Sequence, residues 1–78
     1  MPTPDDLKRR IESHLPGAQA QVEDTTGTGD HFSARVVAPQ FEGLRLLEQH
    51  KLVYAALEAP LADGTIHELR IRTKGTTT

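Results

Sequence analysis

Apolar side chains recur at every fourth position near the start of the chain, and this spacing predicts a first helix. One stripe on its surface is formed by three residues: Leu7, Ile11 and Leu15. The helix is expected to begin at Thr3-Pro4, because a threonine hydroxyl caps a first turn well and proline suits the first helical position. It is expected to end near His14, because Pro16-Gly17 cannot continue a helix.

Alternation of apolar and polar residues predicts three strands, at residues 18–23, 31–38 and 65–74. The second strand has one apolar face, formed by Phe32, Ala34, Val36 and Ala38. In the last strand His67 shares a face with Leu69 and Ile71. Residues 24–30 contain two glycines and predict the turn of an antiparallel hairpin between the first two strands.

Between residues 44 and 57 the apolar spacing changes to the helical period. The stripe expected to face the core comprises Leu46, Leu47, Val53, Tyr54, Leu57 and Leu61. Pro60 is expected to end or kink this helix, so that a short further turn follows. Asp63-Gly64 then closes the segment, because glycine suits the left-handed residue that ends many helices.

The predicted order of elements is helix, strand, strand, helix, short helical turn and strand, an αββααβ arrangement of the α+β class. The helical crossover makes the second and third strands parallel, whereas the hairpin makes the first two antiparallel. We therefore expect a mixed three-stranded sheet with the helices on one face. It forms a single domain over residues 1–78, with residues 75–78 as a frayed tail.

Composition narrows the class of function. A chain of 78 residues leaves little room for a deep cavity, so we expect a protein that binds a partner and not an enzyme with a small-molecule substrate. The absence of cysteine excludes disulfides and thiolate catalysis. The first residues lack the apolar run of a signal peptide, and no segment approaches the roughly 20 apolar residues of a membrane span. We expect a cytoplasmic location and no membrane contact.

Two of the four histidines are expected at one edge of the sheet. Parallel strands begin at the same end, so the 24–30 loop, His31 and His67 converge there, with neighbouring strands about 4.8 Å apart. Imidazole is a common metal ligand, and Asp30 offers an alternative oxygen donor. Regular strand alternation would, however, point the two rings to opposite faces. Because a stable site needs three or four ligands, either another molecule supplies the rest or no metal binds.

The remaining two histidines have ordinary interpretations. His14 complements the negative end of the first helix dipole. His50 lies among the apolar residues of the second helix and is interpreted as a hydrogen-bonded histidine of the core or its boundary.

Several segments match the pattern of a known family, in order and at its spacing. They are His31-Phe32, Arg35-Val36-Val37, Phe41-Glu42-Gly43, the run from Gln49-His50-Lys51 to Leu57, and Ile66-His67. Through them nearly the whole chain resembles the BolA family. The resemblance implies a variant of the class II KH fold, which agrees with the element order above.

The resemblance also implies a partner and a cofactor. The partner is a monothiol glutaredoxin with a Cys-Gly-Phe-Ser site, and the two proteins can share a two-iron two-sulfur cluster. Glutaredoxin and its glutathione supply sulfur ligands, and His67 matches the family's histidine ligand; the isolated protein holds no cofactor. Many members carry a second ligand in a longer loop, so His31 is here only the nearest candidate. The implied role is cluster trafficking or iron regulation.

An alternative function follows from the same resemblance, because BolA-like proteins are also described as DNA-binding regulators of stress response and morphology. The cations that would contact DNA are Arg45, Lys51, Arg70 and Arg72. The net charge of −2 and the absence of the Gly-x-x-Gly loop of true KH domains weigh against it. Gln49-His50-Lys51 is also less basic than the Arg-His-Arg run typical of the family.

Overall fold

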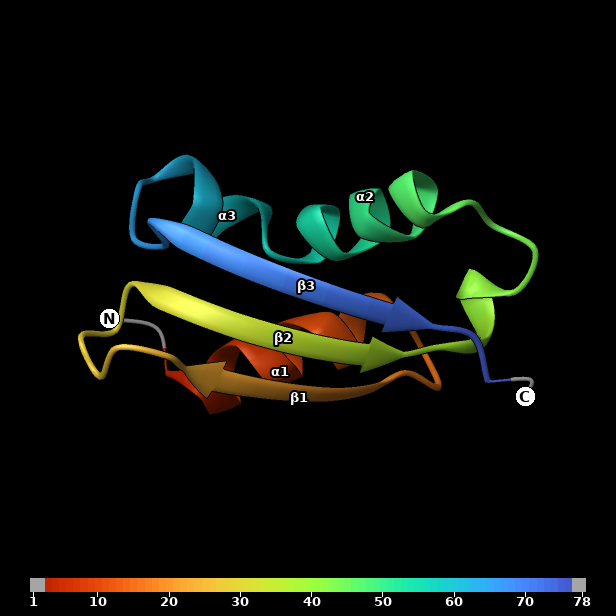
Figure 1. Cartoon of the computed structure of the whole chain (residues 1–78), viewed down its shortest axis with the longest axis horizontal. Coiled ribbons are helices and arrows are strands. Elements are labelled where there is room, and N and C mark those ends of the chain that lie inside the picture. The colour runs from red at the N-terminus through yellow and green to blue at the C-terminus, as the bar shows by residue number, and fades with distance from the viewer. Residues whose placement is uncertain (1–2, 77–78) are drawn as a thin grey trace.

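The computed structural model describes residues 3–76 and contains the predicted αββααβ order (Figure 1). The helices are α1 (Pro4–His14), α2 (Leu46–Ala56) and α3 (Glu58–Ala62), and the strands are β1 (Gln19–Asp24), β2 (His31–Val37) and β3 (Glu68–Lys74). A single 3-10 turn, η1 (Pro39–Phe41), follows β2. Within the described part, every helix falls short of the length and apolar character that a membrane crossing requires.

The three strands form one sheet in the order β1-β2-β3. β1 pairs with β2 antiparallel, and β2 pairs with β3 parallel, as the hairpin and the helical crossover predicted. The register places His31 opposite Glu68 and Arg35 opposite Arg72. The strands β2 and β3 therefore begin at the same end of the sheet, where the hairpin loop also lies (Figure 1).

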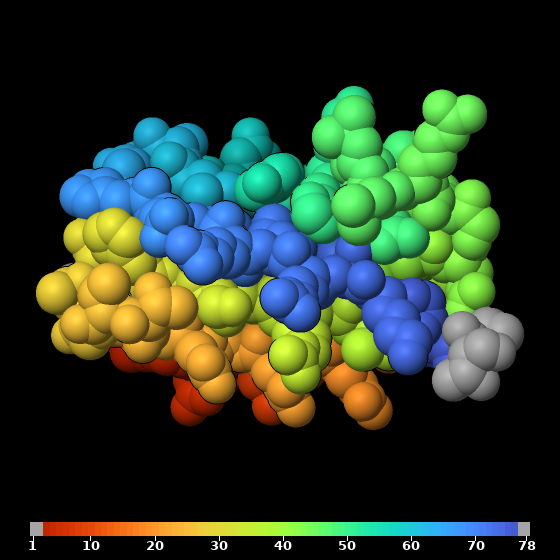
Figure 2. Space-filling model, in the orientation of Figure 1, coloured from red at the N-terminus to blue at the C-terminus, as the bar shows by residue number. Residues whose placement is uncertain are grey.

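One face of the sheet carries the core, and the helices cover it. Phe32, Ala34 and Val36 of β2 are buried there, together with Leu7, Ile11 and Leu15 from α1 and its end. The other face is open, and Figure 2 views the molecule from that side. Arg35 and Ser33 lie on the open face with Gln21 and Glu23, around a shallow depression. The predicted mixed sheet with helices on one face is confirmed.

The start of α1 has the predicted cap. The Asp6 amide donates to the Thr3 hydroxyl, and the Thr3 amide donates to the Asp6 carboxylate, both at 3.2 Å. This reciprocal pair satisfies amide groups that a helix end leaves without partners. The hydrogen bond from the Thr3 backbone, and then that from its hydroxyl, lowers the pKa of Asp6.

The predicted apolar stripe of α2 was wrong in half of its members. Leu46, Leu47 and Tyr54 are exposed, with 62%, 66% and 43% of their surface accessible, whereas Val53 and Leu57 are fully buried. The reason is Gln49, which lies one helical turn before Val53 on the same face of α2. Its side-chain oxygen accepts from the Thr73 hydroxyl at 2.6 Å, and its nitrogen donates to main-chain oxygens of Leu44 and Phe41.

A polar side chain thus occupies the inward position in the first turn of α2. The neighbouring leucines are turned outward as a consequence, because residues on one helix face recur at three- and four-residue spacing. The helix also begins at Leu46 and not at residue 44, after Gly43 with a φ of +76°. Leu61 is only partly buried and packs against the core cluster from α3.

The last strand begins later than predicted, at Glu68 in place of residue 65. Ile66 is buried, and its amide donates to the main-chain oxygen of Pro60 in α3 at 3.1 Å. This amide is therefore bonded to the helix and not to a neighbouring strand. His67 consequently lies just before the strand. At the other end, Thr76 donates to Glu42 at 3.3 Å, and residues 77–78 of the predicted tail lie outside the described residues.

Candidate metal-binding edge

The edge where β2 and β3 begin is held together by the main chain of Asp30. Its carbonyl oxygen accepts the amides of His67 at 2.8 Å and of Glu68 at 3.2 Å. The hairpin loop is thereby joined directly to the start of β3. The predicted convergence of the loop, His31 and His67 is present in the structure.

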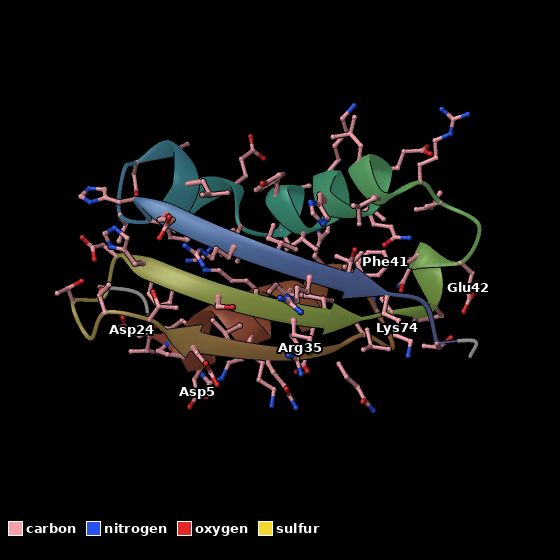
Figure 3. All side chains as sticks on the ribbon, in the orientation of Figure 1. Asp5, Asp24, Arg35, Phe41, Glu42 and Lys74 are labelled. Carbon is pink, nitrogen blue, oxygen red and sulfur yellow. The ribbon has the colours of Figure 1, made fainter. Side chains whose placement is uncertain are left out.

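The loop between β1 and β2 is built on Asp24. Its carboxylate accepts the amides of Thr26, Gly27 and Gly29, at 3.3, 2.9 and 2.9 Å. Both glycines have positive φ, +75° and +77°, which lets the chain wrap around the carboxylate. Asp24 marks the strand end that carries this loop (Figure 3). The sequence contained a signal for this role, since aspartate before a Thr/Gly-rich turn commonly binds amides two or more residues on.

The Asp30 carboxylate bridges the two histidines. One oxygen, Oδ1, lies 2.8 Å from Nδ1 of His31, and the other, Oδ2, lies 3.1 Å from Nδ1 of His67. The Thr28 hydroxyl also donates to Oδ1. The imidazole rings are perpendicular, with centroids 6.2 Å apart.

The sequence-based expectation that the two rings point to opposite faces is therefore wrong. Alternation applies only inside a regular strand, and His67 lies before β3 begins. Because His67 lies outside the regular strand, its side chain can approach Asp30 and lie beside His31. Thr28 and the bridging carboxylate were not foreseen as parts of this edge, because only the folded loop brings them to the rings.

Electrostatics at this edge follow from the bridge. The Thr28 hydroxyl, followed by His31, lowers the pKa of Asp30 to about 2, so the carboxylate is ionised at neutral pH. The hydrogen bond that His31 donates to Asp30 in turn raises the pKa of His31. The side chain of His67 is 65% accessible and that of His31 33%, so His67 is the more open of the two.

The arrangement lacks ligands for a metal of its own. Among residues 3–76, no group of three or more His, Cys, Asp or Glu side chains is placed to hold a metal ion. Both Nδ1 atoms face Asp30, and the described residues provide no hydrogen-bond partner for either Nε2 atom. What this edge presents is two imidazole nitrogens that face away from Asp30.

The four cations named for nucleic-acid binding lie in two separate places. Arg70 and Arg72 are exposed on β3 and, with Arg35 labelled in Figure 3, belong to the open face of the sheet. Lys51 is exposed on α2, and Arg45 precedes that helix, which packs on the other face of the sheet. The structure therefore does not join them into one patch.

The two other histidines occupy the expected positions. His14 lies exposed in the last turn of α1. His50 is half-buried at the boundary of the core, but its Nε2 atom is buried without a hydrogen-bond partner, contrary to the expected bond.

Fold and site together define a class of protein: a small α+β domain with a mixed three-stranded sheet, whose one edge presents an exposed imidazole beside a carboxylate. The sequence model of the BolA family, described as BolA-like protein, matches residues 3–78. The chain therefore belongs to the BolA family.

Relatives and solved structures agree with this assignment. Protein BOLA2 of Arabidopsis thaliana is 40% identical over 73 residues, which cover 92% of this chain and 76% of that protein. A bolA protein homologue from Coxiella burnetii is 38% identical with a TM-score of 0.78, covering 97% of this chain and 94% of that one. The BolA domain of SufE1 from Arabidopsis thaliana is 29% identical with a TM-score of 0.80, covering 94% and 91%.

Proposed function

We propose that this protein is a non-enzymatic adaptor that docks a monothiol glutaredoxin and shares a two-iron two-sulfur cluster with it. His67 ligates one iron of that cluster. The observation that supports the proposal is the environment of His67: its side chain is largely exposed, its Nδ1 lies 3.1 Å from the Asp30 carboxylate, and its Nε2 is open. Histidines that bind metals commonly have their other ring nitrogen held by a carboxylate in this way.

The donor chemistry of the edge fits such a cluster. Histidine replaces cysteine as a ligand to one iron in some two-iron clusters, so an imidazole nitrogen is an adequate donor. The chain contains no cysteine, and thiolates must therefore come from the partner and its glutathione. His31 is the nearest second donor, 6.2 Å away between ring centroids. When bound, the cluster is the cargo that the adaptor passes on.

The role that follows is cluster trafficking or iron regulation in the cytoplasm. An adaptor with this role requires no small-molecule substrate. The partner recognises the edge formed by the hairpin loop and the start of β3.

Anaerobic reconstitution with a monothiol glutaredoxin and glutathione tests the proposal. The wild-type complex should show cluster absorption and circular dichroism that the His67→Ala variant loses or shifts. His14→Ala is the matched control, because His14 is also exposed but lies at the end of α1, outside this edge. Spectra that are identical for wild type and His67→Ala contradict the ligand role.

DNA binding is a second candidate, and one observation favours it. Arg35 and Arg72 are register partners on the open face, Arg70 lies on the same face, and no ion pair is formed by these arginines among residues 3–76. Binding there predicts a falling affinity with salt, and Arg70→Ala should reduce the slope of log K against log salt by about one. Lys51→Ala on α2 is the control. A flat salt response excludes this function.

A further inference from the structure

We propose that Asp30 is a positioning residue, whose carboxylate sets the Nδ1–H tautomer of both imidazoles and thereby presents their Nε2 atoms outward. The tautomer is a property of the isolated chain. Its consequence for a cluster rests on the proposed function.

The first step of the argument is hydrogen-bond chemistry. An ionised carboxylate can only accept, so a ring nitrogen that is hydrogen-bonded to it carries the proton. Nδ1 of His31 makes such a bond to Oδ1 at 2.8 Å, and Nδ1 of His67 lies 3.1 Å from Oδ2. The bond places the proton of neutral His31 on Nδ1, and the negative charge beside Nδ1 of His67 favours the same tautomer, in which Nε2 keeps the lone pair that a metal requires.

The second step is that both oxygens of the Asp30 carboxylate already have partners within the chain. Its Oδ1 accepts from Thr28 and His31, and its Oδ2 lies 3.1 Å from Nδ1 of His67. Direct coordination of a metal by this carboxylate would compete with these contacts. Asp30 therefore acts through the histidines, in place of the oxygen-ligand role that its sequence position suggested.

The third step separates positioning from folding. The main-chain oxygen of Asp30, and not its side chain, accepts the amides of His67 and Glu68. A substitution at position 30 that keeps the backbone thus leaves His67 beside the loop and removes only the acceptor. The side chain of Asp30 is partly exposed, 28% accessible, so truncation opens no core cavity.

The test is the tautomer of His67 in the isolated protein, read from long-range ¹⁵N–¹H correlations of the imidazole roughly two pH units above the ordinary histidine pKa of about 6.5. We expect Nδ1–H in the wild type. In Asp30→Ala, which removes both acceptor oxygens, His67 should change to a mixture or to Nε2–H. Backbone amide shifts of β1 and β2 verify that each variant is folded.

Asp24→Asn is the matched control, because Asp24 shapes the same loop through three amides but touches neither ring. Its His67 tautomer should match the wild type. The proposal is overturned if the wild-type ring already carries its proton on Nε2, if Asp30→Ala leaves the tautomer unchanged, or if Asp24→Asn changes it equally.

A second measurement links the tautomer to the cluster. In the reconstituted complex with glutaredoxin, loss of supports to a metal-bound histidine commonly weakens binding by about 10- to 100-fold. Asp30→Ala should speed cluster loss to a chelator by a factor in that range, with Asp24→Asn near wild type. If the tautomer changes but no wild-type complex holds a cluster, the proposed function fails while the positioning role of Asp30 stands. If the complex forms and Asp30→Ala loses its cluster at the wild-type rate, the positioning role is contradicted.

Discussion

The amide of His67 donates to the main-chain oxygen of Asp30 at 2.8 Å, and this bond joins the hairpin loop to the start of β3. The carboxylate of the same residue lies 3.1 Å from Nδ1 of the His67 ring. Both the backbone and the side chain of Asp30 therefore contact this histidine. The conformation of the loop between β1 and β2 therefore affects the edge where the rings of His31 and His67 lie together.

A methyl group at Gly27 should destabilise this loop through backbone strain alone. Gly27 has a φ of +75°, and a Cβ there would meet nothing within 4 Å. Gly27→Ala should lower the free energy of unfolding by about 1 kcal/mol, because a left-handed conformation is unfavourable for residues with a side chain. Urea denaturation measures the loss. Gly27→Asn should lose less, since asparagine tolerates this conformation, and equal losses would contradict the strain explanation.

The side of α2 that faces the core can be tested by comparing two leucines. Leu57→Ala removes a fully buried side chain and should lower the free energy of unfolding by about 2–5 kcal/mol. Leu47→Ala removes a side chain that is 66% exposed and should change it by less than about 0.5 kcal/mol. Chemical denaturation gives both values. A large loss for Leu47→Ala would contradict the outward orientation of this side chain.

The polar contact between Gln49 and Thr73 should be energetically coupled. Gln49 also donates to main-chain oxygens of Phe41 and Leu44, so Gln49→Ala leaves several acceptors and the Thr73 hydroxyl without their partner. We expect a loss of about 1–3 kcal/mol for Gln49→Ala. In a Thr73→Val background the loss should be smaller, with a coupling of at least about 0.5 kcal/mol. Additive losses would show that the contact contributes nothing.

The cap of α1 should weaken in acid. The pKa of Asp6 is lowered in the folded protein from its ordinary 3.8, so its contribution to stability is present above pH 3.8 and disappears as the pH falls through the lower folded value. Asp6→Asn should therefore destabilise at neutral pH and approach the wild type in strong acid. Denaturation of both proteins across this range measures the difference. Thr3→Ala should cost about 1 kcal/mol at neutral pH, as loss of a cap does.

Much of the fold could be predicted because its signals are local. The α1 stripe of Leu7, Ile11 and Leu15 and the alternation around Phe32 are each read within a few residues, and both are buried as expected. The parallel pairing of β2 and β3 followed from the crossover length. The predicted start of β3 was too early. The amide of Ile66 bonds to Pro60 of α3, and the alternation of apolar and polar residues does not reveal such a contact.

The sequence by itself determined the order of elements, the mixed sheet and the meeting of the 24–30 loop with His31 and His67 at one edge. These depend on periodicity, turn residues and chain connectivity, which are properties of neighbouring residues. Only the tertiary structure decided which side of α2 faces the core and which way His67 points. Those outcomes depend on contacts between residues far apart in the chain, Gln49 with Thr73 and Asp30 with His67. Patterns of neighbouring residues do not predict such contacts.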